Sequence, residues 1–157
     1  MEASFLTTSS KRLWIRCKSW ELKAESKDME EQKSEVERIA YKDLQVWQKS
    51  MEFANQVIRV IDDMDTPRKH YRLLEQLESA VTSVPMNIAE GKGRESKKEF
   101  IHFLYIARGS IYETMTLLEI IQRQGWINPD KFKELESSAI EIIKMLKGLI
   151  KAIARTT

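Results

Sequence analysis

The chain has 157 residues, of which 42% are hydrophobic and 32% are charged, and its formal net charge is +2 at pH 7. With only 5 glycines and 3 prolines it is unlike a loop-rich β protein, and its length suits one domain with a disulfide-free core. So small a net charge predicts no partner, and an argument for nucleic acid must rest on local basic clusters. The single cysteine, Cys17, excludes an internal disulfide and fits a cytoplasmic location. No apolar run approaches the roughly 20 residues that span a bilayer.

The first 40 residues lack a sustained apolar period and carry dense charges of both signs after Lys27. Lys11, Arg12 and Arg16 interrupt any apolar core of a secretory signal. We therefore expect residues 1–40 to form an extension, disordered or partly helical, outside a helical domain over residues 41–157. Met29 is a second candidate start of the native protein.

The first helix of the domain should begin near Asp43, whose carboxylate is suited to cap free backbone N–H groups. Apolar residues at helical spacing predict its core-facing side. They are Trp47, Met51, Ala54, Ile58 and Ile61. Further apolar residues widen the apolar face of this helix and of the last one, and we interpret them as intersubunit contacts. They are Val46, Phe53, Val57, Val60, Ile140, Ile143 and Ile150.

The other three helices have clear end signals. Thr66 and Pro67 should start the second helix, Ser96 with Glu99 has capping-box spacing, and Gly125 should end the third. Asn128 followed by Pro129 should start the fourth. Their apolar stripes are Leu73, Leu74, Leu77, Ala80, Val81, Val84 and Ile88; Phe100, Leu104, Ala107, Ile111, Leu118 and Ile121; and Phe132, Leu135, Ala139, Ile142, Leu146, Leu149 and Ile153. Four helices with short connections predict an all-α, antiparallel up-down-up-down four-helix bundle.

The stretch from Ser83 to Glu113 is the most distinctive part of the chain. Gly91-Lys92-Gly93 predicts a tight turn with positive φ. Pro85 lies within the helix that precedes this turn and predicts a kink there. Fifteen residues here follow one motif: Ser83, Pro85, Asn87, Ile88, Ala89, Glu90, Gly91, Arg94, Glu99, Phe100, Phe103, Leu104, Ala107, Gly109 and Ser110. Earlier matches are Asp43, Leu44, Val46, Trp47, Gln48, Gln76, Leu77 and Ala80. From Tyr41 onward the chain thus resembles the bacterial 23S ribosomal RNA intervening-sequence protein family.

The resemblance implies a fold more firmly than an activity. Similar proteins assemble as ring-like homopentamers, and related retroelement accessory proteins bind nucleic acid and a reverse transcriptase. The resemblance therefore implies a homo-oligomer, expected to be a pentamer, with ribosomal or other structured RNA as a partner. The chain departs from the pattern at Glu78-Ser79, where relatives carry two arginines, and at Met115, where they carry a glutamate.

Polar motif residues have two interpretations. Asn87 and Glu90 could satisfy carbonyls freed by Pro85 and pair with Arg94, or they could contact a neighbouring subunit or ligand. We favour the structural interpretation for the motif as a whole, which includes Pro85, Asn87, Glu90, Gly91, Glu99, Gly109 and Ser110.

Glu99 and His102 have the Glu-x-x-His spacing of di-iron bundle proteins. The second such motif is missing, because His70 has no glutamate three residues before it. We predict no catalytic residue, no metal site and no cofactor, and a metal-dependent enzyme stays a distant third interpretation.

Two basic clusters are the candidate RNA-binding residues. A loop cluster comprises Lys92, Arg94, Lys97 and Lys98, and a helical cluster comprises Lys144, Lys147, Lys151 and Arg155. At 100° per residue the helical cluster falls within an arc of about 80°. It is either a solvated face that complements the helix dipole or a surface that follows phosphates. The leading hypothesis is a non-enzymatic, RNA-associated bundle, and the alternative is a protein-interaction scaffold without nucleic acid.

Overall fold

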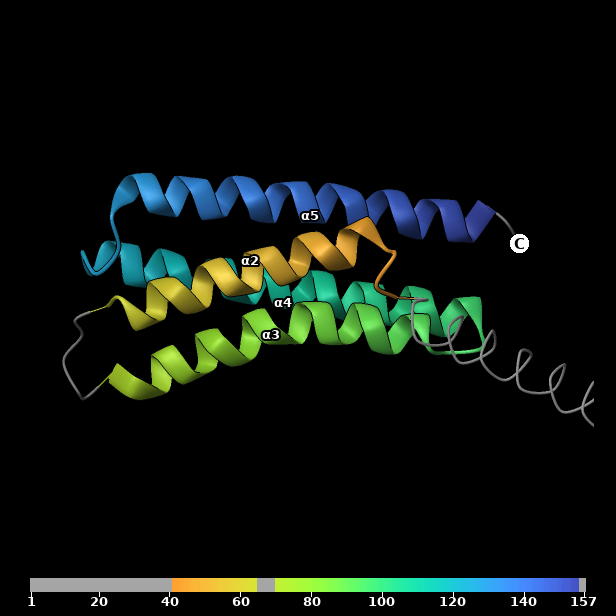
Figure 1. The fold of residues 1–157 in the computed structure, drawn as a ribbon, viewed down its shortest axis with the longest axis horizontal. Helices are drawn as coiled ribbons and strands as arrows, with labels where there is room; N and C mark the ends of the chain where they lie inside the picture. Colours follow the sequence, from red (N-terminus) through yellow and green to blue (C-terminus); the bar gives the residue numbers. More distant parts are fainter. Residues whose placement is uncertain (1–40, 65–69, 156–157) are drawn as a thin grey trace, which may run out of the picture. The chain divides into compact units, whose positions relative to one another are not determined.

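The structure is a computed structural model that describes residues 41–64 and 70–155, and over these ranges it contains α-helices and no strand. The helices are α2 (Gln45–Asp62), α3 (Tyr71–Lys92), α4 (Lys97–Arg123) and α5 (Pro129–Arg155) (Figure 1). The predicted all-α class is confirmed. The expectations for residues 1–40, and for Thr66 and Pro67 as the start of a helix, lie outside the described residues. Within the described part of the chain, no helix is long and apolar enough to cross a membrane.

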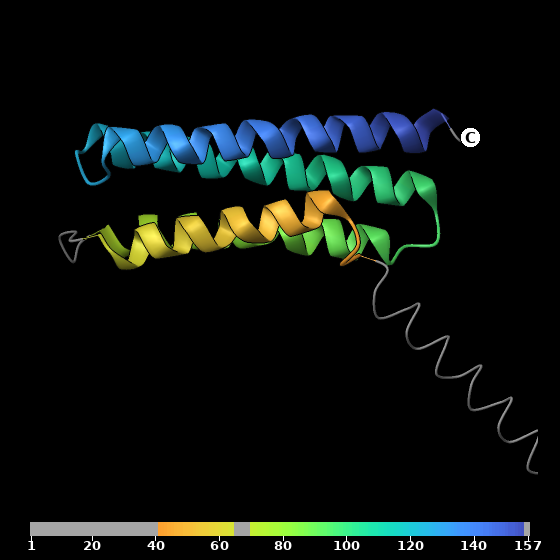
Figure 2. The same ribbon diagram turned by 45° about the horizontal axis from the view of Figure 1, so that its top comes forward.

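Each helix packs against the next one in the chain, and α5 closes the bundle against α2 (Figures 1 and 2). Successive helices run in opposite directions because their connections are short, so the predicted up-down-up-down arrangement is confirmed. Helices α3 and α4 share the most extensive contact, and α2 and α5 share the least.

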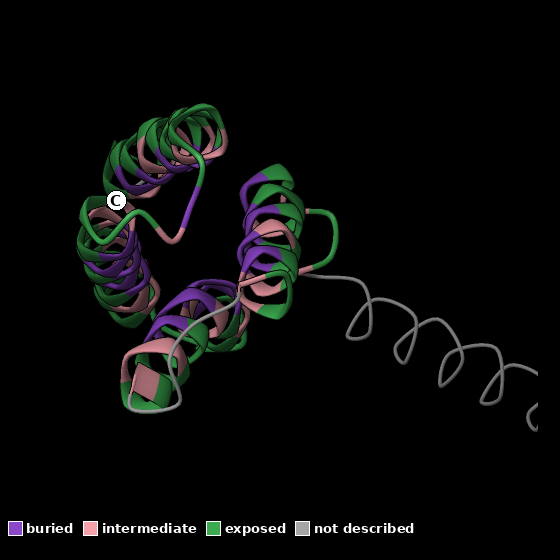
Figure 3. Cartoon of the chain, turned by 90° about the vertical axis from the view of Figure 1, so that its left-hand side faces the viewer, coloured by how far each residue is buried: buried purple, intermediate pink, exposed green. Residues whose placement is uncertain are grey.

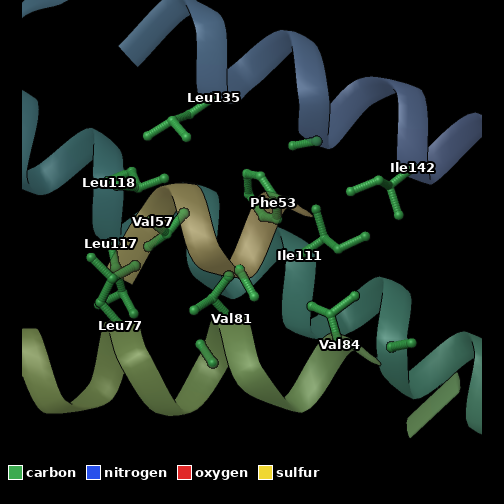
Figure 4. Close-up of a cluster of buried hydrophobic side chains, with 14 of the residues drawn as sticks. Phe53, Val57, Leu77, Val81, Val84, Ile111, Leu117, Leu118, Leu135 and Ile142 are labelled. Carbon is green, nitrogen blue, oxygen red and sulfur yellow. The ribbon is translucent and has the colours of Figure 1, made fainter. Parts of the chain in front are cut away.

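The buried sides of the four helices face one another (Figure 3). In the close-up, Phe53 and Val57 of α2 lie between Leu135 and Ile142 of α5 and Val81 of α3 (Figure 4). The predicted stripes of α3, α4 and α5 are confirmed, because their central residues are buried. These are Leu77, Ala80, Val81, Val84, Ile88, Leu104, Ala107, Ile111, Leu118, Ile121, Leu135, Ala139, Ile142 and Leu146.

The predicted core face of α2 is wrong by about a quarter turn. Its buried apolar residues are Val46, Phe53, Ala54, Val57 and Val60, each at most 9% exposed. Four of these, together with the buried Ile150 of α5, were expected to contact another subunit, and they contribute to the core instead. Met51 is 37% exposed, while Trp47 and Ile61 pack partly buried at the edge of the core. Ser50 shares the buried face because its hydroxyl donates a hydrogen bond of 2.7 Å to the carbonyl of Trp47.

Three predicted helix ends are confirmed. The hydroxyl of Ser96 accepts a hydrogen bond of 3.1 Å from the backbone N–H of Glu99. The side-chain carbonyl of Asn128 accepts one of 2.8 Å from the N–H of Asp130. Gly125 has a φ of 75° just after α4, where left-handed backbone favours glycine.

Two other end assignments are wrong. Leu44, not Asp43, precedes α2, and no side chain caps that helix. Gly91 does not form a positive-φ turn: it is buried inside α3, and Gly93 after the helix has a φ of −77°. A Cβ atom at position 91 would lie 2.6 Å from the Cβ of Phe103 and 2.9 Å from the Phe100 ring. The glycine therefore serves the close approach of α3 to α4.

Candidate nucleic-acid interface

The bundle brings the two basic clusters to the same end. Helix α3 ends at Lys92, α4 begins at Lys97 and α5 ends at Arg155, and alternating helix directions put these three termini together (Figure 1). The clusters are far apart in sequence, but up-down connectivity makes them neighbours. That connectivity is the signal that could have joined them from sequence alone.

The loop cluster is partly engaged within the chain. The Arg94 guanidinium forms an ion pair with Glu90 and lies 4.9 Å from the centre of the Phe103 ring. The ammonium group of Lys92 lies 6.0 Å from the Phe100 ring centre. Lys97 and Lys98 are exposed. The acidic residues Glu95 and Glu99 are exposed in the same segment, so its positive charge is partly offset.

The helical cluster, which lies on α5, is different, because its side chains form no ion pair among the described residues. Lys144, Lys147, Lys151 and Arg155 are all exposed, and none forms an ion pair within residues 41–64 and 70–155. No acidic residue occurs between Ile142 and Arg155. At 1.5 Å per residue the cluster extends over about 16 Å of the helix. Helical spacing puts Lys133 and the exposed Ile140 on the same face, toward the start of α5.

Charges are segregated along α5. Its first half carries Asp130, Lys131, Lys133, Glu134, Glu136 and Glu141, and its second half carries the basic cluster alone. Acidic residues near the start of a helix and basic residues near its end both stabilise the helix through its macrodipole. The pattern thus has a structural benefit whether or not a ligand binds.

The motif residues meet where α3 packs on α4. The hydroxyls of Ser83 and Ser110 are hydrogen-bonded to each other across this seam, and Ser110 is buried. The Asn87 amide donates a hydrogen bond of 2.7 Å to the carbonyl of Ser83. Glu90 pairs with Arg94 as expected from the sequence. Pro85 is buried within α3.

Gly109 is the exception among the motif residues. It is exposed in the middle of α4, and a Cβ atom built there would have nothing within 4 Å. Contacts among residues 41–64 and 70–155 therefore do not explain a glycine at this position.

The Glu99 and His102 side chains are both exposed, and the backbone of Glu99 takes part in the cap of α4. No group of three or more His, Cys, Asp and Glu side chains that could hold a metal occurs in the described residues.

Comparison with protein families supplies the decisive observation. The model of the 23S rRNA-intervening sequence protein family matches residues 42–148, which covers most of the described bundle. The chain belongs to this family. The resemblance read from the Ser83–Glu113 motif is therefore confirmed.

A solved structure supports membership of the 23S rRNA-intervening sequence protein family. It is a Bacteroides thetaiotaomicron protein described as having unknown function and belonging to the S23 ribosomal protein family. The two chains are 29% identical and superpose with a TM-score of 0.63 over 68% of this chain and 98% of the other. A comparison with curated proteins finds no significant match.

Proposed function

We propose that this family member is a non-catalytic, homo-oligomeric protein that associates with structured RNA in the bacterial cytoplasm. The observation that carries the proposal is the run of exposed basic side chains on α5 that form no ion pair with any described residue. The family description, which refers to an insertion in 23S ribosomal RNA, supports RNA as the polyanion.

The proposed contact is made to the phosphate backbone. Lys144, Lys147, Lys151 and Arg155 would each displace counterions from the RNA, which gives affinity without base recognition. Among the described residues of α5, Ile140 is the one large exposed hydrophobic side chain and no aromatic side chain is exposed, so this helix offers no row of rings on which bases could stack. Binding should therefore depend strongly on salt and weakly on base sequence.

Replacing Lys144, Lys147 and Lys151 together with glutamine should weaken RNA binding about 10- to 100-fold at low salt. The plot of log affinity against log salt should lose a slope of roughly 2 to 3, because each phosphate contact contributes about 0.7 to 0.9. Fluorescence anisotropy with a labelled structured RNA, repeated at several salt concentrations, measures both quantities. The fold should survive, since all three side chains are exposed.

The matched control replaces Arg59, Arg72 and Arg123 with glutamine. All three residues are exposed at the other end of the bundle, so their replacement removes the same amount of positive charge there. The control should leave the salt slope nearly unchanged. Equal losses of RNA affinity and of salt slope in both variants would indicate nonspecific electrostatic attraction rather than binding at the helical cluster. A wild-type protein that binds no RNA even at low salt would refute the proposal.

The homo-oligomer is proposed to form through the outer face of α4. Between Phe100 and Leu118 the only side chains with full charges are Arg108 and Glu113, so α4 is apolar on its outer side as well as in the core. Helices that are apolar all round are usually covered by protein. The exposed apolar residues of this face are Tyr105, Ile106, Tyr112 and Ile120, each 39–51% exposed. Gly109 lies among them and would let a neighbouring helix come close.

Replacing Gly109 with leucine should disrupt the oligomer without unfolding the chain. The added Cβ atom has no described atom within 4 Å, and leucine favours a helix over glycine by roughly 1 kcal/mol. Light scattering should change from about five times the 18.4 kDa chain mass toward the monomer. Gly148→Leu is the control, because Gly148 is exposed in similar open space on α5. A wild-type monomer at micromolar concentration would contradict the proposal.

The outer face of α4 also favours a second candidate function. It could bind a different protein, as in a scaffold similar to retroelement accessory proteins, with no role for nucleic acid. A wild-type protein that forms the oligomer but binds no RNA would favour this scaffold function.

A further inference from the structure

A polar groove lies between α2 and α5, the pair of neighbouring helices with the least contact. Its inner part is a hollow of about 80 Å³ lined by Gln56, Ser138 and Glu141 above the buried side chains of Phe53 and Ile142. A wider hollow of about 270 Å³ continues it along the helices and shares Lys49, Glu52 and Glu141 with it.

The groove contains hydrogen-bond acceptors that lack donors. The side-chain oxygen of Gln56 is buried and has no hydrogen-bond partner, the one such side-chain atom among the described residues. The Glu141 carboxylate forms neither an ion pair nor a side-chain hydrogen bond within the same residues. Glu52 already pairs with Lys49 at 3.2 Å. A buried acceptor without a donor costs free energy, so an occupant that donates hydrogen bonds would stabilise the groove.

We propose that this groove binds an alkylguanidinium group. A guanidinium offers five N–H donors and no acceptor, which complements the Gln56 oxygen and the unpaired Glu141 carboxylate. The charged lining residues are the basic Lys49 and the acidic Glu52 and Glu141, so the net charge of the lining is negative. The groove therefore favours a cation and disfavours an anion. The apolar stem of the ligand would lie in the wider hollow, beside Met145. Helical spacing puts Glu141 and Met145 on a different side of α5 from Lys147 and Lys151, and Lys144 lies one turn from Glu141, but the inference rests on none of these basic side chains.

Titration of the full-length protein with butylguanidinium, followed by amide NMR spectra, tests the proposal. We expect saturable shifts at the Gln56 side-chain amide and at Ser138, with a Kd on the order of 1 mM for so small a ligand. Glu141→Gln should weaken binding about tenfold, because it removes the unpaired charge. Glu136→Gln is the matched control: it removes one exposed carboxylate from the same helix outside the groove and should leave the Kd unchanged. Butylurea, a neutral probe of the same shape, should not bind detectably.

The outcomes separate the sources of the ligand. If N-acetylarginine amide binds as well as butylguanidinium, the natural occupant is an arginine side chain of a polypeptide. If only butylguanidinium binds, the occupant is a small free molecule. The proposal is overturned if butylguanidinium produces no saturable shifts up to about 50 mM, or if butylurea binds equally well. Equal weakening by Glu141→Gln and Glu136→Gln would overturn it too.

Discussion

Replacing Leu146 with alanine should lower the free energy of unfolding by about 2–5 kcal/mol, the usual cost of truncating a fully buried leucine. Leu146 is 0% exposed and lies on the buried side of α5, where it belongs to the continuous core. The loss has two parts: the transfer free energy of the removed carbons and the cavity that the surrounding helices cannot fill. Urea or guanidinium titration followed by circular dichroism measures it.

Leu149→Ala is the matched control for this prediction. Leu149 is on the same helix, and its replacement with alanine removes the same atoms. Its side chain is only partly buried against the core. Its loss should be clearly smaller. A loss below about 1 kcal/mol for Leu146→Ala, or a larger loss for Leu149→Ala, would mean that α5 is packed in a different rotation.

Gly91→Ala should also destabilise the bundle, by roughly 1–3 kcal/mol net. Alanine favours a helix over glycine by about 1 kcal/mol, but this gain is outweighed by the collision of the new methyl group with Phe103 at 2.6 Å. The Cβ atom of Phe103 is fixed to its backbone and cannot turn away, so α3 and α4 must move apart. Denaturant titration checks the prediction.

Gly148→Ala is the matched control for the glycine. It is exposed within α5 and has nothing within 4 Å of the added atom, so the same substitution should stabilise the chain by roughly 0.5–1 kcal/mol. Changes of the same sign at both glycines would show that α3 and α4 do not meet as closely as the structure places them.

Local signals in the sequence predicted much of the fold. Caps such as Ser96 and Asn128 depend on neighbouring residues, so they could be identified without the rest of the molecule. The stripes of α3 and α5 were also predictable, because each of these helices has one dominant apolar side. The stripe of α4 was predicted too, although this helix carries further apolar residues on its outer side.

The core face of α2 could not be predicted in this way. The helix has two apolar sets with the same helical period, one containing Trp47 and Met51 and the other containing Phe53 and Val57. Periodicity alone does not choose between them, and packing against α3 and α5 does. Ser50 added to the error, because a buried serine that bonds to its own helix backbone looks like a surface residue in the sequence.

The residues of the candidate interface were predicted from the sequence, but the two clusters were not combined into one surface at that point. The two basic clusters are visible in the sequence, whereas their shared end of the bundle follows only from the order and direction of the helices. The role of Gly91 was hidden for a similar reason, since the missing Cβ atom matters only when Phe100 and Phe103 of the next helix lie against it.

The segregation of charge along α5 has a consequence for how a partner first meets the protein. In an antiparallel bundle the backbone dipoles of neighbouring helices oppose one another, so side chains largely determine the long-range field. The acidic residues at Asp130, Glu134 and Glu136 and the basic ones from Lys144 onward then form a permanent dipole along the bundle axis. An approaching polyanion would exert a torque that turns the end near Arg155 toward it before contact. Since the Debye length is about 8 Å at physiological salt, this orientation occurs only in the final approach.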